Sequence, residues 1–240
     1  MILLSLLATL LFILETIVLS IFSVFTSVVD RTGKFYLWAG RNWSRIALLL
    51  FGIRLTVRGT EHIQSGAHYV YAANHSSYMD IPVLLAGIPD NLRLTLRKSL
   101  TRIPIWGWAL LIGPFLILDR TNPHQAERTI AVAIRRIRAG ASVLFFPEGT
   151  RTPTGHMQSF KRGAFHLAQE AGTAVMPVAI VGTYAILPRH KWLPRWGQRV
   201  ELRIGEAVLP HAVSPGGTRA EEIRLMQETE RRVRQLLEEA

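Results

Sequence analysis

The first 29 residues are almost wholly apolar, and this run constrains the fold more than any other feature of the sequence. As one helix, a run of this length extends about 43 Å, enough to cross a hydrocarbon core of about 30 Å. No basic segment precedes it and no A-x-A site follows it, which argues against a secretory signal peptide. Glu15, near its middle, is costly in lipid and favours a helix that packs on protein, tilts, or lies partly in the interface.

A second apolar segment, residues 35–51, mixes tryptophans with arginines and is too polar to span a membrane cleanly. It predicts an amphipathic helix that folds back onto the membrane face. Arg31 and Lys34, which follow the first run, favour a cytoplasmic location for the rest of the chain. The alternative for both segments is a pair of buried core helices. We assign residues 1–52 to a membrane-associated helical segment, and whether its first helix spans the bilayer or lies in it stays open.

The charge and the cysteine count limit partners and chemistry. The net charge is +11 at pH 7, which implies an acidic partner. Three kinds of partner fit: nucleic acid, an anionic bilayer and a phosphorylated substrate. The apolar start and the lack of a recognisable nucleic-acid motif argue against nucleic acid. The absence of cysteine excludes a thiol nucleophile, a disulfide framework and a zinc site built on thiolates.

After Gly52, short strand-like runs alternate with helical patterns. Seven ranges are typical of strands: 54–58, 68–73, 93–97, 115–118, 142–146, 175–181 and 199–204. Four ranges are typical of helices: 81–86, 106–112, 125–139 and 163–170. This alternation predicts one α/β domain over residues 53–217, with a mostly parallel central sheet flanked by helices. Residues 218–240 open with the capping box Thr218-x-x-Glu221 and predict a C-terminal amphipathic helix.

The first chemical signal is N-H-S-S-Y-M-D at residues 74–80, directly after a strand. Five residues turn a helix about 140° beyond a full turn, so His75 and Asp80 do not share a helix face. They meet only if His75 ends the strand and Asp80 lies in the first turn of the next helix. There the carboxylate fixes the imidazole tautomer while the other ring nitrogen faces a substrate hydroxyl, for which it acts as general base. The alternative is a capping histidine.

The second signal is F-P-E-G-T-R at residues 146–151, directly after another apolar strand. Ligands of open α/β sheets bind at this edge. Arg151 can hold a phosphate bidentately, and Glu148 can accept hydrogen bonds from hydroxyls. A solvated Glu–Arg turn is the alternative.

Two further basic segments are weaker candidates for binding an anion. Arg120 ends G-x3-I-x-D-R and follows a strand, and Lys161 lies in F-K-R-G-A-F just before a helix, where an anion is favoured. Arg120 could equally belong to a solvated loop pair, and the Lys161 segment taken alone favours an exposed basic helix start.

Together these blocks resemble the glycerophospholipid acyltransferase family, in its 1-acylglycerol-3-phosphate acyltransferase branch. The family order N-H-x4-D, G-x3-I-x-D-R, F-P-E-G-T-R and V-M-P-V runs over residues 74–178, and F-K-R-G-A-F is similar to a further family block. The first two apolar segments resemble the two-helix membrane anchor of bacterial members. R-K-S-L at residues 97–100 departs from the Lys-x-Glu-Leu that members often have.

The resemblance implies a site and a reaction. His75 and Asp80 would be the catalytic dyad. The acceptor would be bound by Arg120, Glu148, Gly149, Thr150, Arg151 and Lys161. The dyad would move a fatty acyl group from a thioester of coenzyme A or acyl-carrier protein to the sn-2 hydroxyl of 1-acylglycerol 3-phosphate, giving phosphatidic acid. The reaction would run at the cytoplasmic face of an anionic membrane, with no metal and no bound cofactor.

Other functions remain open at the level of sequence. The acceptor could be another lysolipid, such as a lyso-aminolipid, or the protein could remodel phospholipids. A non-catalytic lipid-binding protein of the same fold is the alternative outside the enzymes, and the intact His75–Asp80 pair argues against it.

Overall fold

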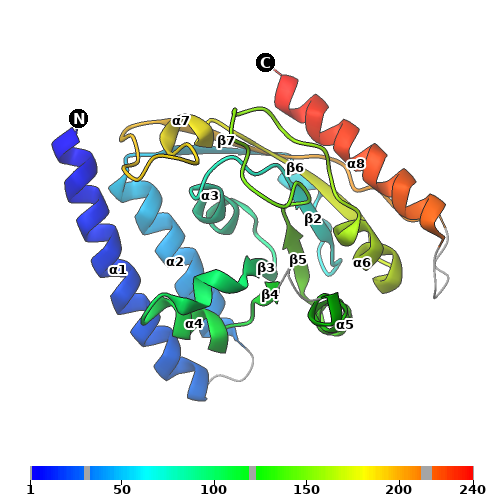
Figure 1. Ribbon diagram of the computed structural model, residues 1–240, viewed down its shortest axis with the longest axis horizontal. Coiled ribbons are helices and arrows are strands. Elements are labelled where there is room, and N and C mark those ends of the chain that lie inside the picture. The colour runs from blue at the N-terminus through cyan, green and yellow to red at the C-terminus, as the bar shows by residue number, and fades with distance from the viewer. Residues whose placement is uncertain (1, 30–32, 119–122, 212–217, 240) are drawn as a thin grey trace.

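The strand-like runs of the sequence pair into one seven-stranded sheet in the order β1-β7-β6-β2-β5-β3-β4 (Figure 1). The structure, a computed structural model, describes residues 2–29, 33–118, 123–211 and 218–239. The strands are β1 (Arg54–Arg58), β2 (Val70–Ala73), β3 (Leu92–Arg97), β4 (Leu116–Leu118), β5 (Ser142–Phe145), β6 (Val175–Val181) and β7 (Arg199–Ile204). Every neighbouring pair is parallel except β6 and β7. The mostly parallel α/β fold is therefore confirmed, and the predicted strand bounds agree within two residues.

Helices cover both faces of this sheet. The longer helices of the domain are α3 (Asp80–Gly87), α4 (Trp106–Ile112), α5 (Pro123–Arg138), α6 (Gly163–Ala171) and α8 (Arg219–Glu238). The sequence did not predict the short helices η1 (Thr60–His62), η2 (Lys98–Arg102) and α7 (Thr183–Ile186), or the antiparallel direction of β7. The predicted cap of the last helix forms, because Oγ1 of Thr218 accepts a hydrogen bond from the amide of Glu221 at 3.3 Å.

The alternation of side chains along β2 divides the core into two layers. Tyr71 and Ala73 point into the layer under α2, α3 and α4. Val70 and Ala72 point into the layer under α5, α6 and α8. All four residues of β2 are completely buried, which places the carboxyl end of this central strand on a rigid support.

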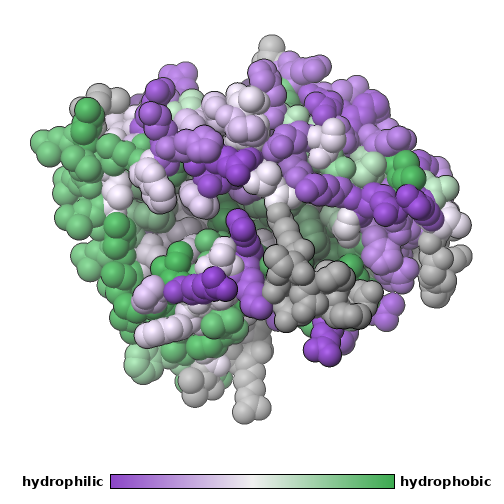
Figure 2. All heavy atoms as spheres, viewed as in Figure 1, coloured by the Kyte–Doolittle hydropathy of each residue, from purple (hydrophilic) through white to green (hydrophobic). Residues whose placement is uncertain are grey.

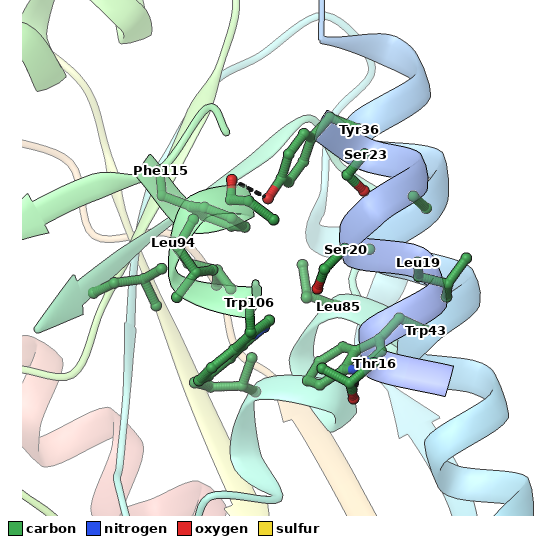
Figure 3. A pocket seen from close by; sticks show the side chains of 16 residues that line it. Thr16, Leu19, Ser20, Ser23, Tyr36, Trp43, Leu85, Leu94, Trp106 and Phe115 are labelled. Carbon is green, nitrogen blue, oxygen red and sulfur yellow. Dashed lines mark hydrogen bonds between the residues drawn. The ribbon is translucent and has the colours of Figure 1, made fainter. Parts of the chain in front are cut away.

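The N-terminal pair packs along one side of the domain. The helices α1 (Ile2–Val29) and α2 (Lys34–Leu50) contact each other, and Nε1 of Trp43 donates to Oγ1 of Thr16 at 2.9 Å. Between the pair and the domain lies an apolar cavity, whose lining includes Leu85, Leu94 and Trp106 (Figure 3).

The outer side of α1 is apolar and exposed. Among the described residues, one helix, over Ile2–Ser27, is long and apolar enough to cross a membrane, and 11% of its most apolar window is buried. Apolar side chains gather on the molecular surface over α1 and around α4 (Figure 2). The two carboxyl oxygens of Glu15 are buried, as expected for an acidic residue that faces protein. This exposure does not fit the alternative of a buried core helix.

Candidate active site

The structure brings His75 and Asp80 together at the carboxyl end of β2. His75 lies two residues after the strand, and Asp80 is the first residue of α3. Nδ1 of His75 lies 2.8 Å from Oδ2 of Asp80. Asp80 is completely buried, while 16% of the imidazole side chain is exposed. The spacing of five residues thus acts across a strand end and a helix start, as the sequence predicted.

Asp80 is held by hydrogen bonds from every side. Its Oδ2 also accepts the amides of Ser76 at 2.8 Å and Ser77 at 2.9 Å. Its Oδ1 accepts the hydroxyl of Thr183, the first residue of α7, at 2.5 Å. A carboxylate oxygen can only accept, so Nδ1 of His75 carries its proton toward Asp80. In the neutral ring this leaves Nε2 as the acceptor nitrogen, and no residue that the structure describes forms a hydrogen bond with it.

The turn after β5 packs directly against His75. The imidazole stacks on the ring of Phe146, with 3.9 Å between ring centres and 16° between planes. The backbone of His75 is held at both ends, because its amide donates to Oε1 of Glu148 at 2.6 Å and its carbonyl accepts from the amide of Thr152 at 2.8 Å. The two sequence motifs are therefore one structural unit.

Glu148 has its oxygens turned into the protein. It is 2% exposed, and its Oε2 accepts the amide of Gln158 at 2.9 Å while Oε1 accepts the amide of His75. Burial raises the pKa of Glu148 above its ordinary value, against the opposing effect of these hydrogen bonds. The carboxylate thus holds the 146–151 turn against the loop that carries His75.

Arg151 projects a guanidinium with spare hydrogen-bond donors. Its Cζ lies 3.5 Å from the centre of the Tyr78 ring, a cation–π contact. Its Nη1 is buried and has no hydrogen-bond partner in the part of the chain that the structure describes. Burial is the main cause that lowers the pKa of Arg151 from its ordinary value. A buried N–H without a partner is costly, so this group suits an incoming anion.

The remaining predicted site residues surround this turn. Gly149 has φ of 83°, and a Cβ there would meet Nζ of Lys161 at 3.1 Å, so glycine lets Lys161 lie over the turn. Thr150 is exposed, and its carbonyl accepts from Nε2 of Gln158 at 3.2 Å. Arg120 lies outside the described residues.

Comparison with known proteins identifies the family. The family model described as "Acyltransferase" matches residues 54–181, which include β2, the dyad and the turn after β5. The chain belongs to this acyltransferase family.

Individual relatives agree with this membership. The chain is 34% identical over 187 residues to the 1-acyl-sn-glycerol-3-phosphate acyltransferase of Pseudomonas aeruginosa, covering 75% of this chain and 70% of that one. It is 34% identical over 156 residues to a chloroplast 1-acyl-sn-glycerol-3-phosphate acyltransferase of Arabidopsis thaliana, covering 65% of this chain and 43% of that one. The chain thus spans less than half the length of that relative, and 48% of the length of a similar Brassica napus protein.

A solved structure of the family has the same fold. The crystal structure of the 1-acyl-sn-glycerophosphate acyltransferase PlsC from Thermotoga maritima matches with a TM-score of 0.79 and 28% sequence identity. The match covers 98% of this chain and 95% of that one, so it includes the N-terminal helices.

Several residues of this candidate site were not singled out from the sequence. Three of them lie outside the motifs described above: Thr183, Gln158 and Thr152. Thr183 donates to Asp80, Gln158 donates to Glu148, and the amide of Thr152 donates to the carbonyl of His75. One signal could have found Thr183. It follows Gly182 just after β6, and β6 pairs with β2, so it emerges at the same edge of the sheet as His75.

Proposed function

We propose that this acyltransferase moves a fatty acyl group from a thioester to the free sn-2 hydroxyl of 1-acylglycerol 3-phosphate, giving phosphatidic acid. The observation that carries the proposal is the pair of His75 and the buried Asp80, which leaves Nε2 of His75 facing away from the carboxylate. Arg151 follows the neighbouring parallel strand, and its Nη1 has no hydrogen-bond partner among the described residues. The names of the relatives support the same reaction.

In the proposed step, His75 acts as general base. Nε2 takes the proton of the acceptor hydroxyl as its oxygen attacks the thioester carbonyl, and a new C–O bond forms. Asp80 stabilises the imidazolium. When the tetrahedral intermediate collapses, the C–S bond breaks and the thiolate takes the proton back from His75. The step needs no metal and no bound cofactor.

The developing oxyanion requires a donor near the dyad. The amide of Gly149 already donates to the carbonyl of Phe146 at 3.0 Å. We therefore assign the donor to a later amide of the same turn, at Thr150 or Arg151.

The phosphate of the acceptor is assigned to Arg151, whose planar guanidinium can make two parallel hydrogen bonds to it. Lys161, which lies over Gly149, adds a second positive charge, and Thr150 adds a hydroxyl on the exposed side. Glu148 serves as a positioning residue, since both of its oxygens accept backbone amides. Arg120 would complete the set by the family resemblance.

The lipid chains of the substrates explain a membrane location. The exposed apolar side of α1 continues over α4, where Trp108, Leu111 and Ile112 are also exposed. The apolar cavity behind it is lined in part by Ile81, the residue after Asp80. We infer that this side binds an anionic bilayer at its cytoplasmic face, where the net positive charge favours binding.

The test is to supply the purified protein with 1-acylglycerol 3-phosphate and acyl-coenzyme A or acyl-acyl-carrier protein in turn, and to identify the product by mass. Other lysolipids are offered in parallel, and the acceptor that is consumed fastest defines the substrate. His75→Ala should lower turnover by about 10²–10⁴-fold. His211→Ala, whose side chain is 71% exposed and remote from the motifs, is the matched control. Near-normal turnover by His75→Ala would remove the general-base assignment.

A further inference from the structure

A second cavity lies at the amino end of β3, at the opposite end of the strands from His75. Its volume is about 430 Å³, and its walls come from the end of α1, the starts of α2 and β3, and the end of α5. Arg93 belongs to the beginning of β3 and pairs in register with Val143 at the beginning of β5. His75 follows the carboxyl end of β2, so the two sites lie at opposite ends of the strands.

Arg93 is buried in this cavity, and no acidic residue in the described part of the chain forms an ion pair with it. It is 7% exposed, and its Nη1 is buried with no hydrogen-bond partner among the described residues. Its neighbours Leu92 and Leu94 point into the layer under α2 and α3, so strand alternation turns Arg93 toward α5. Asp90, the nearest carboxylate in sequence, is used elsewhere, because it accepts the hydroxyls of Tyr71 at 2.9 Å and Ser142 at 2.5 Å.

A second arginine faces the same space. Arg136, in the last turn of α5, lines the cavity and donates through Nη1 to the carbonyl of Pro114 at 2.5 Å. The described residues that line the cavity include no aspartate or glutamate. Burial, and then the like charge of Arg136, lower the pKa of Arg93 to about 10, so Arg93 stays charged at neutral pH. Burial also lowers the pKa of Arg136 from its ordinary value.

Two guanidinium groups at one cavity, one of them buried, carry an energetic cost in the folded protein. An unpaired buried charge is strongly unfavourable, whereas the same group is stabilised by a bound anion that takes charge-assisted hydrogen bonds. Asn91 also lines the cavity and adds a polar side chain. The volume is large enough for a phosphate together with a substituent.

We propose that the Arg93–Arg136 cavity is a second anion site, which binds a phosphate group. The phosphate belongs to a lipid headgroup or to a free soluble phosphate. The site is separate from the one proposed for the acceptor, and it does not depend on the reaction that the His75 site performs.

The test uses the full chain in detergent micelles, in an Arg151→Gln background that removes the phosphate ligand proposed for the active site. Thermal unfolding is followed against inorganic phosphate in one arm. In the other arm, vesicles of phosphatidylcholine with or without phosphatidic acid replace the micelles in phosphate-free buffer. The variants are Arg93→Met and Arg136→Gln, and Arg138→Gln, an exposed arginine of the same helix, is the matched control.

Phosphate should raise the unfolding temperature of the parent and of Arg138→Gln. Its apparent affinity should be weaker by about tenfold or more in the two cavity variants, as loss of a charged hydrogen bond implies. Without any anion, Arg93→Met should unfold at a higher temperature than the parent, because it removes a buried unpaired charge. A merely structural arginine would show the opposite shift. If Arg93→Met does not fold, Arg93→Lys keeps the charge but loses the planar fork, and should still weaken phosphate binding.

The two arms separate the sources of the phosphate. Protection by inorganic phosphate that depends on Arg93 indicates a soluble ligand. Protection that depends on Arg93 and appears only with phosphatidic acid indicates a lipid headgroup. Equal responses in the parent and both cavity variants, or no response in either arm, would overturn the proposal.

Discussion

Asp80→Asn separates the charge of the dyad from its geometry. The amide oxygen can take the place of Oδ2, where it still accepts from His75, Ser76 and Ser77. The amide nitrogen then faces Thr183, whose hydroxyl can accept from it and donate to Oγ of Ser76, 2.8 Å away. The reverse orientation would place the NH2 group against two backbone N–H groups, so the structure selects the first.

The selected orientation keeps the tautomer of His75 and removes only a negative charge. Two unit charges about 4 Å apart interact by about 4 kcal/mol at an effective dielectric constant of about 20. At about 1.4 kcal/mol per tenfold in rate, losing that stabilisation of the imidazolium corresponds to about 10³-fold. The hydrogen bond from His75 to the neutral amide oxygen is retained, and it preserves part of the stabilisation of the imidazolium. We therefore expect turnover to fall by about 10²–10³-fold, with little change in the unfolding temperature.

The assay measures thiol release from the acyl thioester, with thermal unfolding as the control for folding. Thr183→Val is the companion variant, since it removes one hydrogen bond to Asp80 and leaves the charge. It should cost less turnover than Asp80→Asn. Wild-type turnover by Asp80→Asn would refute the role of the carboxylate charge, and loss of the folded state would refute the proposed orientation of the amide.

Three further variants test the turn after β5 and the membrane surface. Glu148→Gln should lower the free energy of unfolding by about 1–3 kcal/mol, because the amides of His75 and Gln158 bind different oxygens of Glu148 and the NH2 group that replaces one of these oxygens cannot accept. Glu206→Gln, whose side chain is 78% exposed, should not lower it. Because burial raises the pKa of Glu148, the stability of the wild type relative to Glu148→Gln should fall as pH rises from about 4.5 through the raised value, and a constant difference in chemical unfolding would contradict this. Arg151→Lys should raise KM for the acceptor by about 10- to 100-fold with a smaller change in kcat, and an unchanged KM in steady-state kinetics would exclude the phosphate contact. Trp192→Ser should weaken co-sedimentation with anionic vesicles, since Trp192 is 93% exposed in a loop rich in cations, and equal binding would remove this loop from the membrane surface.

The sequence was most informative where local pattern and chemistry agree. Strands buried on both faces appear as continuous apolar runs. The predicted first and last residues of β6, Val175 and Val181, therefore agree with the structure. The geometry of His75 and Asp80 also followed from spacing alone, because five residues fit a strand end followed by a helix start. Glu148 was found from the sequence, but its contacts were not, because one amide that it binds belongs to His75, 73 residues away, and the other belongs to Gln158, which lies in no motif.

The sequence by itself determined the alternation of strands and helices, the apolar N-terminal pair and the residues of the dyad, since each depends on neighbours close in the chain. Only the tertiary structure decided that β7 runs antiparallel, that Thr183 holds Asp80 from 103 residues away, and that Arg93 and Arg136 share one cavity. These features depend on pairing between distant segments. The free energy of such contacts is set by packing and burial of the whole chain, which no local window of sequence contains.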